Sequence, residues 1–287
     1  MDWSDWALWV AVAAVAVVLL QMARLMRKNR RLRQLADEAN RLRRKADATE
    51  QRNRQIKQEM TSNISHELKT PVSSIRGYLE ILLSDKPIDE ERRRHYLERC
   101  YSQTLRLSDL IQDVSIINKI EESSNLFPRT DVDAAGVAAE AVGDLEDKAA
   151  AAGISVRDNL PHMPLVGNRE LLYCIFRNLV ENSIAYAGHG STITLETYEP
   201  AKGVSHSPTT ATHYFIHYYD TGRGVPDEYL TRLFDRFVRI GEGRSRADGG
   251  TGLGLSIVKH AVLFHGGEIY AKNRPEGGLE FFFSLKK

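Results

Sequence analysis

The stretch NISHELKTPV, residues 63–72, carries side chains suited to chemistry within a pattern that otherwise predicts continuous helix. His66 and Glu67 are adjacent, and Thr70 follows the histidine by four positions. Pro71 then removes a backbone N–H donor and favours a kink. Imidazole changes its charge near neutral pH, so a histidine beside a carboxylate can exchange protons with a reactant. The stretch predicts a reactive position on a helix that bends at the proline.

A second polar group lies on an amphipathic helix predicted for residues 168–187. Asn178 and Asn182 are four residues apart and Tyr186 lies one turn further, so the three share one face. Such amides commonly indicate only a solvated face. In line with an aromatic ring, they could also supply a magnesium ligand and an aromatic surface. From these residues alone, the solvated face is the simpler interpretation.

The segment YYDTGRGVP, residues 218–226, places Asp220 at the end of a predicted strand, with Gly222 and Gly224 after it. An aspartate at the edge of an apolar pocket can accept a hydrogen bond from an exocyclic amine. Glycine lets the backbone turn tightly around a ligand, although many ordinary turns also contain two glycines.

The segment RADGGTGLGLSIV, residues 246–258, runs into a predicted helix. Its glycines leave backbone N–H groups free near a helix N-terminus, an arrangement that suits phosphate. The spacing matches neither a Walker P-loop nor a dinucleotide fingerprint. The preceding GEGRSR is basic and glycine-rich, as a mobile lid over phosphates would be.

Helices and strands alternate over residues 128–287, which predicts an antiparallel sheet covered on one side by helices. The helices are expected at residues 133–153, 168–187, 227–239 and 253–267. The strands are expected at residues 154–160, 191–199, 212–220, 267–273 and 279–285, the last two forming a hairpin. In the third strand Asp220 and Tyr218 share one face, and His213 and His217 lie on the other, where we expect them to face solvent. His265, at a helix C-terminus, is expected to be charged.

Residues 59–122 predict a helical hairpin. Apolar residues continue along both arms, Pro87 ends the first arm, and Asp89 can cap the second. Each arm has an apolar face that a lone hairpin cannot cover, so two chains would close a four-helix bundle.

Residues 25–58 follow a heptad of apolar and small residues, which predicts a parallel coiled coil. The seam is weak, and a charged, solvated helix is the alternative.

Trp6–Ala23 contains no charge and as a helix would span about 27 Å, close to a bilayer core of about 30 Å. A basic cluster, residues 24–33, follows it, which places the remainder of the chain in the cytoplasm. A cleaved signal peptide is disfavoured because the leading segment is acidic.

The net charge of +1 argues against general nucleic-acid binding. The two cysteines, Cys100 and Cys174, are far apart and fit small buried positions in a reduced compartment. The histidines do not suggest a metal cluster.

Five segments together resemble the H, N, G1, F and G2 boxes of bacterial sensor histidine kinases, in the family's order. They are NISHELKTPV, RNLVENSIAYA, DTGRGVP, LFDRFVRI and GGTGLGLSIV. The resemblance implies a multidomain chain: a transmembrane helix, a coiled coil, a dimeric helical hairpin, and an α/β sandwich of the ATP-binding fold shared with gyrase and Hsp90-type ATPases. The expected ranges are residues 1–24, 25–58, 59–122 and 128–287.

The resemblance also assigns roles. His66 would be the phosphoacceptor, Glu67 would orient or take its Nδ1 proton, and Thr70 would position a water for dephosphorylating the partner. The expected ATP-binding residues are Asn178, Asn182, Tyr186, Asp220, Gly222, Gly224, Arg239, Thr251, Gly252, Leu253 and Gly254. Asn182 would bind Mg²⁺, Asp220 the adenine amine, Arg239 the γ-phosphate, and Phe234 and Phe237 would anchor the lid.

Two positions depart from the family pattern. Ala185 stands where a lysine is common, which removes a phosphate contact that Lys259, Arg244 or Arg246 could replace. Asn168 stands where an aspartate is frequent at a helix start, and it remains a good N-cap.

The expected function is a membrane-anchored, homodimeric kinase of the bacterial inner membrane that uses Mg-ATP to phosphorylate His66. It would pass the phosphoryl group to the receiver domain of a separate response regulator, and it would also dephosphorylate that regulator. The alternative is a scaffold or phosphatase-dominant regulator that binds nucleotide but phosphorylates poorly.

Overall fold

The computed structural model describes residues 3–84, 87–122, 127–199, 211–240 and 250–287. For many residues before Met60 only the helical backbone is described. The chain divides into two compact units, residues 1–62 and 63–287, which are treated separately below.

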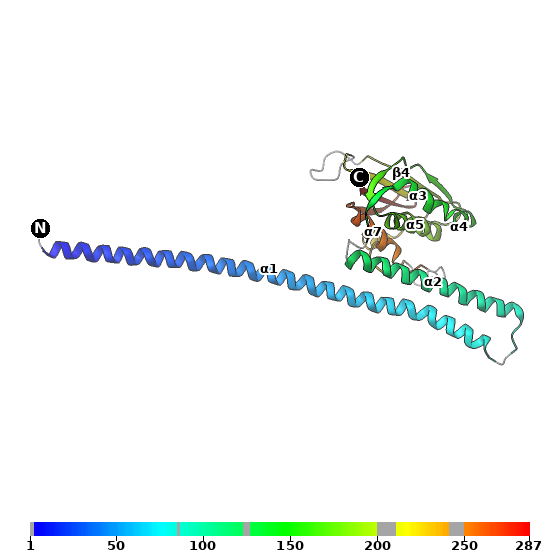
Figure 1. The fold of residues 1–287 in the computed structure, drawn as a ribbon, viewed down its shortest axis with the longest axis horizontal. Helices are drawn as coiled ribbons and strands as arrows, with labels where there is room; N and C mark the ends of the chain where they lie inside the picture. The colour runs from blue at the N-terminus through cyan, green and yellow to red at the C-terminus, as the bar shows by residue number, and fades with distance from the viewer. Residues whose placement is uncertain (1–2, 85–86, 123–126, 200–210, 241–249) are drawn as a thin grey trace. The chain divides into compact units, whose positions relative to one another are not determined.

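The first unit is entirely helical over its described residues and belongs to helix α1, Trp3–Leu82, which continues into the second unit (Figure 1). The helix includes the residues predicted as anchor and coiled coil. The side chains of residues 1–19 lie outside the described part of the chain. Among the residues that are described, no helix is both long and apolar enough to cross a bilayer.

The second unit begins with the predicted hairpin, formed by the end of α1 and by α2, Glu90–Glu122. Pro71 lies inside α1, which continues as helix to Leu82. The Oδ1 atom of Asp89 accepts the Arg92 N–H at 2.8 Å, so the predicted cap of α2 is confirmed. Large apolar side chains remain exposed along both arms, including Leu79 of α1 at 41% and Tyr101 of α2 at 68%.

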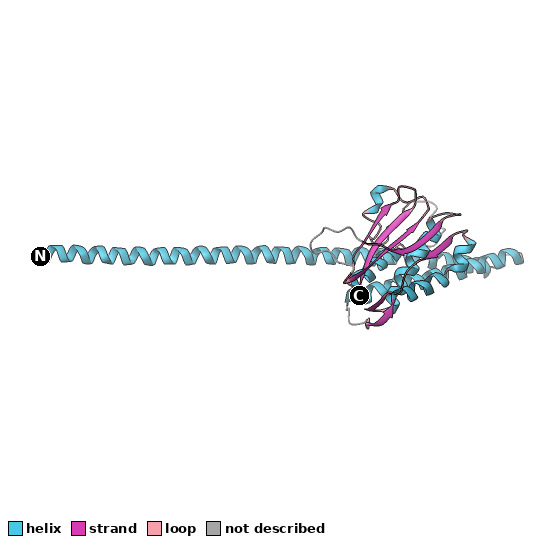
Figure 2. Ribbon diagram, turned by 90° about the horizontal axis from the view of Figure 1, so that it is seen from above, coloured by secondary structure: helices cyan, strands magenta, loops and turns pink. Residues whose placement is uncertain are grey.

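The rest of the second unit is an α/β domain in which helices pack against a five-stranded sheet (Figure 2). The strands are β2 (Ser155–Asp158), β4 (Thr192–Thr197), β5 (His213–Asp220), β7 (Leu279–Lys286) and β6 (Ile269–Asn273), in that spatial order. The helices are α3 (Ala134–Gly143), α4 (Glu146–Ala151), α5 (Arg169–Tyr186), α6 (Asp227–Leu230) and α7 (Gly254–Phe264). A separate two-stranded sheet pairs β1 (Thr130–Asp133) with β3 (Pro164–Gly167).

Side chains along β5 point alternately to the two faces of the sheet, and the apolar ones on one face are covered by the helices. Ile216 and Tyr218 are fully buried on the face against the helices, where α5 packs between α3 and α7. Phe176 of α5 meets Phe283 of β7 there at a ring separation of 6.2 Å. Asp220 ends the same face, so the strand delivers a buried carboxylate to the end of the core, as the sequence predicted.

Several elements differ from the prediction. The pair β2 and β4 is parallel, because the chain between them crosses over through α5. The helix expected over residues 133–153 is two helices, interrupted after Gly143, a weak helix former. The four-residue strands β1 and β3 are too short to show a period in sequence.

The helix expected at residues 227–239 is present only as α6, which ends at Leu230, so the prediction for the remaining residues is wrong. Phe237 has a positive φ of 61°, which no helix accepts, and its N–H donates to the carbonyl of Gly252 at 2.8 Å. A contact with the glycine loop therefore replaces helical hydrogen bonding. Phe234 packs edge-on against Phe281 of β7.

One expectation about histidines is wrong, and a second holds only in part. His265 is 2% exposed, and burial lowers its pKa, so it is neutral rather than a charged helix terminus. His217 is only partly exposed, because its ring stacks on Phe282 at 4.3 Å and lies between Glu196 and Glu280.

Candidate active site

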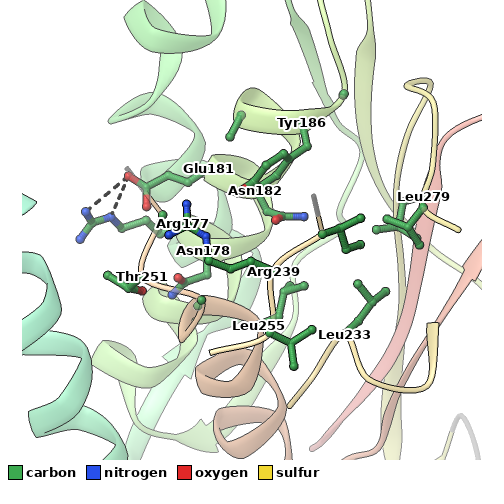
Figure 3. A pocket seen from close by; sticks show the side chains of 18 of the residues that line it. Arg177, Asn178, Glu181, Asn182, Tyr186, Leu233, Arg239, Thr251, Leu255 and Leu279 are labelled. Atoms are coloured by element: carbon green, nitrogen blue, oxygen red, sulfur yellow. Dashed lines mark hydrogen bonds and ion pairs between the residues drawn. The ribbon is translucent and has the colours of Figure 1, made fainter. Parts of the chain in front are cut away.

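The described chain encloses a pocket of about 920 Å³ at the end of the core where Asp220 lies. Its walls come from α5, from the ends of β5 and β7, and from the loops that precede α6 and α7. Figure 3 shows Leu233, Leu255 and Leu279 forming the apolar side of this pocket, opposite polar side chains of α5. The site combines an apolar surface for a flat ligand with charged and amide groups at its rim.

Asn178, Asn182 and Tyr186 all line the pocket from one face of α5, as their spacing predicted (Figure 3). The Nδ2 group of Asn178 donates to the Cys174 carbonyl at 2.8 Å, which turns its carboxamide oxygen outward against Gly254. The solvated-face interpretation of these amides is therefore wrong. The three side chains belong to one cavity wall.

Asp220 is 4% exposed and held by three donors. Its Oδ1 atom accepts the N–H groups of Gly222 at 2.9 Å and of Leu279 at 3.2 Å. Its Oδ2 atom accepts the Ser183 hydroxyl at 2.9 Å. A carboxylate fixed this firmly can present a remaining lone pair to a ligand donor in a set direction.

The glycine loop before α7 forms the opposite rim. Gly250, Thr251, Gly252 and Gly254 line the pocket. Gly252 has a φ of +72°, a conformation that other residues rarely adopt. The N-terminus of α7 lies behind this loop, and the first N–H groups of a helix have no partner within the helix itself, an arrangement that suits phosphate.

Arginine side chains supply the positive charge. Arg239 lines the pocket beside Arg177 and Arg223, two arginines that the sequence pattern did not indicate. Arg177 also pairs with Glu181 on α5 at 3.4 Å (Figure 3). Ala185 lines the pocket without a cation, whereas Lys259 does not line it. Arg244 and Arg246 lie outside the described residues.

Helix α2 closes one side of the pocket through a set of residues that includes Gln112, Asp113 and Ile116. The Thr251 hydroxyl donates to Asp113 Oδ2 at 2.8 Å. Burial raises the pKa of the Asp113 carboxyl to about 6, against the lowering effect of the Thr251 hydrogen bond. The sequence pattern placed Asp113 only on a helix and gave no sign of this contact.

The reactive stretch of α1 lies outside the pocket, to which no described residue of α1 contributes. His66 is exposed. The Glu67 carboxylate pairs with Arg106 of α2 at 3.1 Å, and the Thr70 hydroxyl donates to the His66 carbonyl at 3.3 Å. Neither of these two hydrogen bonds involves the imidazole.

Two of the predicted ATP-binding residues do not line the pocket. Gly222 packs against Ala187, where an added Cβ would come within 2.5 Å of the Ala187 Cα, so it shapes the turn after Asp220. Leu253 is fully buried and forms the N-cap position of α7. Cys174 lines the pocket, and burial raises the pKa of its thiol to about 11, consistent with an unreactive side chain.

Comparison with known families assigns both parts of the second unit. Residues 56–123 match the His Kinase A phospho-acceptor domain, and residues 167–287 match the histidine kinase-, DNA gyrase B- and HSP90-like ATPase domain. The chain is 33% identical over 230 residues to the sensor-like histidine kinase SenX3 of Mycobacterium tuberculosis, covering 80% of this chain and 53% of that protein. It is 30% identical over 242 residues to BaeS of Escherichia coli, covering 83% and 48%.

The protein therefore belongs to the bacterial two-component sensor histidine kinases, with a phosphoacceptor domain and an ATP-binding domain. It spans about half the length of the curated relatives it matches.

Solved structures show the same fold. Histidine kinase ThkA in complex with response regulator protein TrrA matches with a TM-score of 0.60 at 22% identity, covering 80% of this chain and 61% of that one. Histidine kinase AdeS of Acinetobacter baumannii matches with a TM-score of 0.57 at 22% identity, covering 77% and 97%.

Proposed function

We propose that this protein is a membrane-anchored, homodimeric sensor kinase that transfers the γ-phosphoryl group of ATP to His66 and then to an aspartate of a separate response regulator. The observation that carries the proposal is a pocket lined by Asn182, Asp220 and the Gly250–Gly254 loop in the same compact unit as an exposed His66. This combination supplies a nucleotide site and an accessible nucleophile.

The residues that line the pocket support ATP as its ligand. Asp220, fixed by three donors, would accept the adenine amine while Tyr186 lies against the base. Gly224, Gly252 and Gly254, with Thr251, would shape the backbone around the phosphates, and Arg239 would contact the γ-phosphate. Gly222 and Leu253 support this site from behind, by setting the turn after Asp220 and the start of α7.

Asn182, with Asn178 beside it on α5, offers carboxamide oxygens of the kind that magnesium accepts. When bound, Mg²⁺ would neutralise charge on the phosphates. Arg177, Arg223 and Arg239 already provide positive charge on the pocket wall, so the alanine at position 185 need not leave the phosphates without a cation.

In the transfer step His66 Nε2 would form a bond to the γ-phosphorus while the bond from that phosphorus to the β,γ-bridging oxygen breaks and ADP leaves. Glu67 would orient or take the Nδ1 proton, which keeps the attacking nitrogen unprotonated. Because phosphoryl transfer depends mainly on positioning and on charge neutralisation, the main requirement is that the pocket reaches His66.

The partner would be the receiver domain of a response regulator. The ThkA structure contains such a regulator bound to a histidine kinase of the same fold. Thr70, one turn beyond His66 on an exposed helix surface, would position a water that hydrolyses the regulator's acyl phosphate, so the protein would also be a phosphatase.

Dimerisation would cover the apolar side chains left exposed on both arms of the hairpin, such as Leu79 of α1 and Tyr101 of α2. Residues 25–58 would continue the dimer as a coiled coil, because their heptad pattern runs into the hairpin. The uncharged stretch Trp6–Ala23 and the basic cluster behind it support an anchor in the inner membrane with the catalytic part in the cytoplasm.

We also propose the domain boundaries given by the sequence: residues 1–24, 25–58, 59–122 and 128–287. The family matches over residues 56–123 and 167–287 support the last two.

The test is to incubate the purified full chain with γ-labelled ATP. The proposal predicts label that is lost in acid but kept in alkali, and that is absent from the His66→Gln variant. A full chain that binds ATP yet takes up no label would instead support the alternative, a regulator with little kinase activity.

A further inference from the structure

The hydroxyl of Ser183, on α5, has a hydrogen-bond acceptor that is unusual for a serine in a helix. A helical serine commonly donates to the carbonyl four residues earlier, here Leu179. In this structure its hydroxyl donates instead to Asp220 Oδ2 at 2.9 Å. Ser183 is 1% exposed, so this bond is made without competition from bulk water.

The position of Tyr218 explains why Ser183 does not donate to the Leu179 carbonyl. Its hydroxyl lies 2.9 Å from the Leu179 carbonyl and 3.0 Å from Ser183 Oγ, and it donates its single proton to these two acceptors. Tyr218 is fully buried, and burial raises the pKa of its phenol, so the proton stays in place at neutral pH. The carbonyl that the serine would otherwise use is therefore already occupied.

The proton of Ser183 then has one direction left, toward Asp220. The other carboxylate oxygen, Oδ1, is occupied by the N–H groups of Gly222 and Leu279. Of the lone pairs on Oδ2, the serine takes one and leaves another on the oxygen of a residue that lines the pocket. A carboxylate can only accept hydrogen bonds, and the three donors fix the direction in which its remaining lone pair is presented.

We propose that Ser183 and Tyr218 are positioning residues that hold Asp220 as an acceptor and thereby make the pocket selective for purines with a 6-amino group over purines without one. This inference rests on the proposed nucleotide site at Asp220. A ligand amine donates to the free lone pair, whereas a 6-oxo group would meet the carboxylate oxygen to oxygen and be rejected.

The test compares three diphosphates on the purified full chain by calorimetry: ADP, purine riboside 5′-diphosphate, which lacks only the amine, and GDP. For the unchanged protein we expect ADP to bind at least about tenfold more tightly than purine riboside diphosphate, the range for a hydrogen bond to a charged group. GDP should bind more weakly still.

Ser183→Ala removes the donor, and Tyr218→Phe frees the Leu179 carbonyl so that the serine can turn back to it. Both variants should reduce the preference for ADP over purine riboside diphosphate several-fold, chiefly by weakening ADP. Ser284→Ala is the matched control: it removes a buried serine hydroxyl from β7 that accepts from Glu268 N–H, outside the pocket lining. The preference of this control variant for ADP over purine riboside diphosphate should equal that of the unchanged protein.

Each preference compares two ligands on one protein, so a partly unfolded fraction cancels from the ratio. If Ser183→Ala and Tyr218→Phe both keep the full preference for ADP, the inference is overturned while the nucleotide site stands. If the unchanged protein fails to bind ADP, the proposed function fails, and this inference with it.

Discussion

Thr251 of the glycine loop donates its hydroxyl to the carboxylate of Asp113 on α2, across 2.8 Å and 138 residues of sequence. The contact links the helical hairpin directly to the rim of the nucleotide pocket. Asp113 is partly buried there, and the charges of Asp109, Arg177 and Glu181 act on it. A partly buried carboxylate at this place makes the contact sensitive to pH.

Asp113→Asn should stabilise the protein at pH 7.5 and have little effect at pH 3.5, below the unfolded pKa of the aspartate. Burial raises the pKa of Asp113 from 3.8 to about 6, so its contribution to folding is most favourable below pH 4 and is lost as the pH rises through 6. An amide can still accept from Thr251 but carries no charge. We expect a gain of about 2 kcal/mol at pH 7.5, measured by thermal melting at both pH values. Asp147→Asn, which removes an exposed carboxylate of α4, is the control, and an Asp113→Asn variant that melts lower than the unchanged protein at pH 7.5 would refute the interpretation.

Arg106→Gln should raise the initial rate of autophosphorylation. Arg106 holds the Glu67 carboxylate at 3.1 Å, with both side chains partly buried, and so keeps it from the imidazole of His66. Releasing it should increase the rate several-fold. In a Glu67→Gln background the same substitution should change nothing.

The matched control for this experiment is Arg94→Gln, which removes an arginine from a pair with Glu98 on the same helix, exposed to solvent. It should leave the rate unchanged, since exposed pairs contribute little. A gain in rate that persists without the Glu67 carboxylate would show that Arg106 acts by another route.

Asn168→Asp should destabilise the ATP-binding domain even though aspartate is a good N-cap. Asn168 Oδ1 accepts the Leu171 N–H at 3.0 Å, which aspartate could also do. Its Nδ2 group, however, donates to the Pro128 carbonyl at 3.0 Å, where a carboxylate oxygen would be repelled. Urea denaturation should show a loss of about 1 kcal/mol or more. An aspartate variant as stable as the unchanged protein would contradict this account.

Stability should fall as the pH drops below about 6.5, and His265 should be one cause. Its neutral ring accepts the Asn168 N–H at 3.0 Å and donates to the Ala261 carbonyl at 2.7 Å. Burial lowers its pKa below the value of 6.5, so its contribution is complete above pH 6.5 and is lost as the pH falls toward the folded pKa.

His265→Gln should be less stable at pH 7.5 but should lose less stability between pH 7.5 and 5.5. His95→Gln, an exposed histidine of α2, should show the same pH dependence as the unchanged protein. If the stability of the His265 variant falls as steeply between pH 7.5 and 5.5 as that of the unchanged protein, another group is responsible.

Features with a strong local signal could be predicted from the sequence. The spacing of Asn178, Asn182 and Tyr186 placed them on one face of a helix, although it did not show that this face forms a pocket wall, and Asp220 was placed at the end of its strand. The cap at Asp89 follows from short-range chemistry. In each case the neighbours that decide the structure lie within a few residues.

Features set by distant residues could not be predicted in this way. Ser183 reads as an ordinary small helical residue until Tyr218 and Asp220 are placed beside it. Asp113 gave no sign of its contact with Thr251, because nothing near either residue encodes the other. Phe237 does not continue the expected helix, because its N–H donates to the carbonyl of Gly252, 15 residues further along the chain.

The central claim is that ATP bound at Asp220 phosphorylates His66. It predicts that variants at these two residues lose different activities. The most direct measurement records ATP binding and uptake of γ-label together for the full chain, for His66→Gln and for Asp220→Asn. His66→Gln should bind ATP normally and take up no label, whereas Asp220→Asn should lose both binding and label. Label on the His66→Gln variant, or labelling by Asp220→Asn at the unchanged rate, would contradict the account.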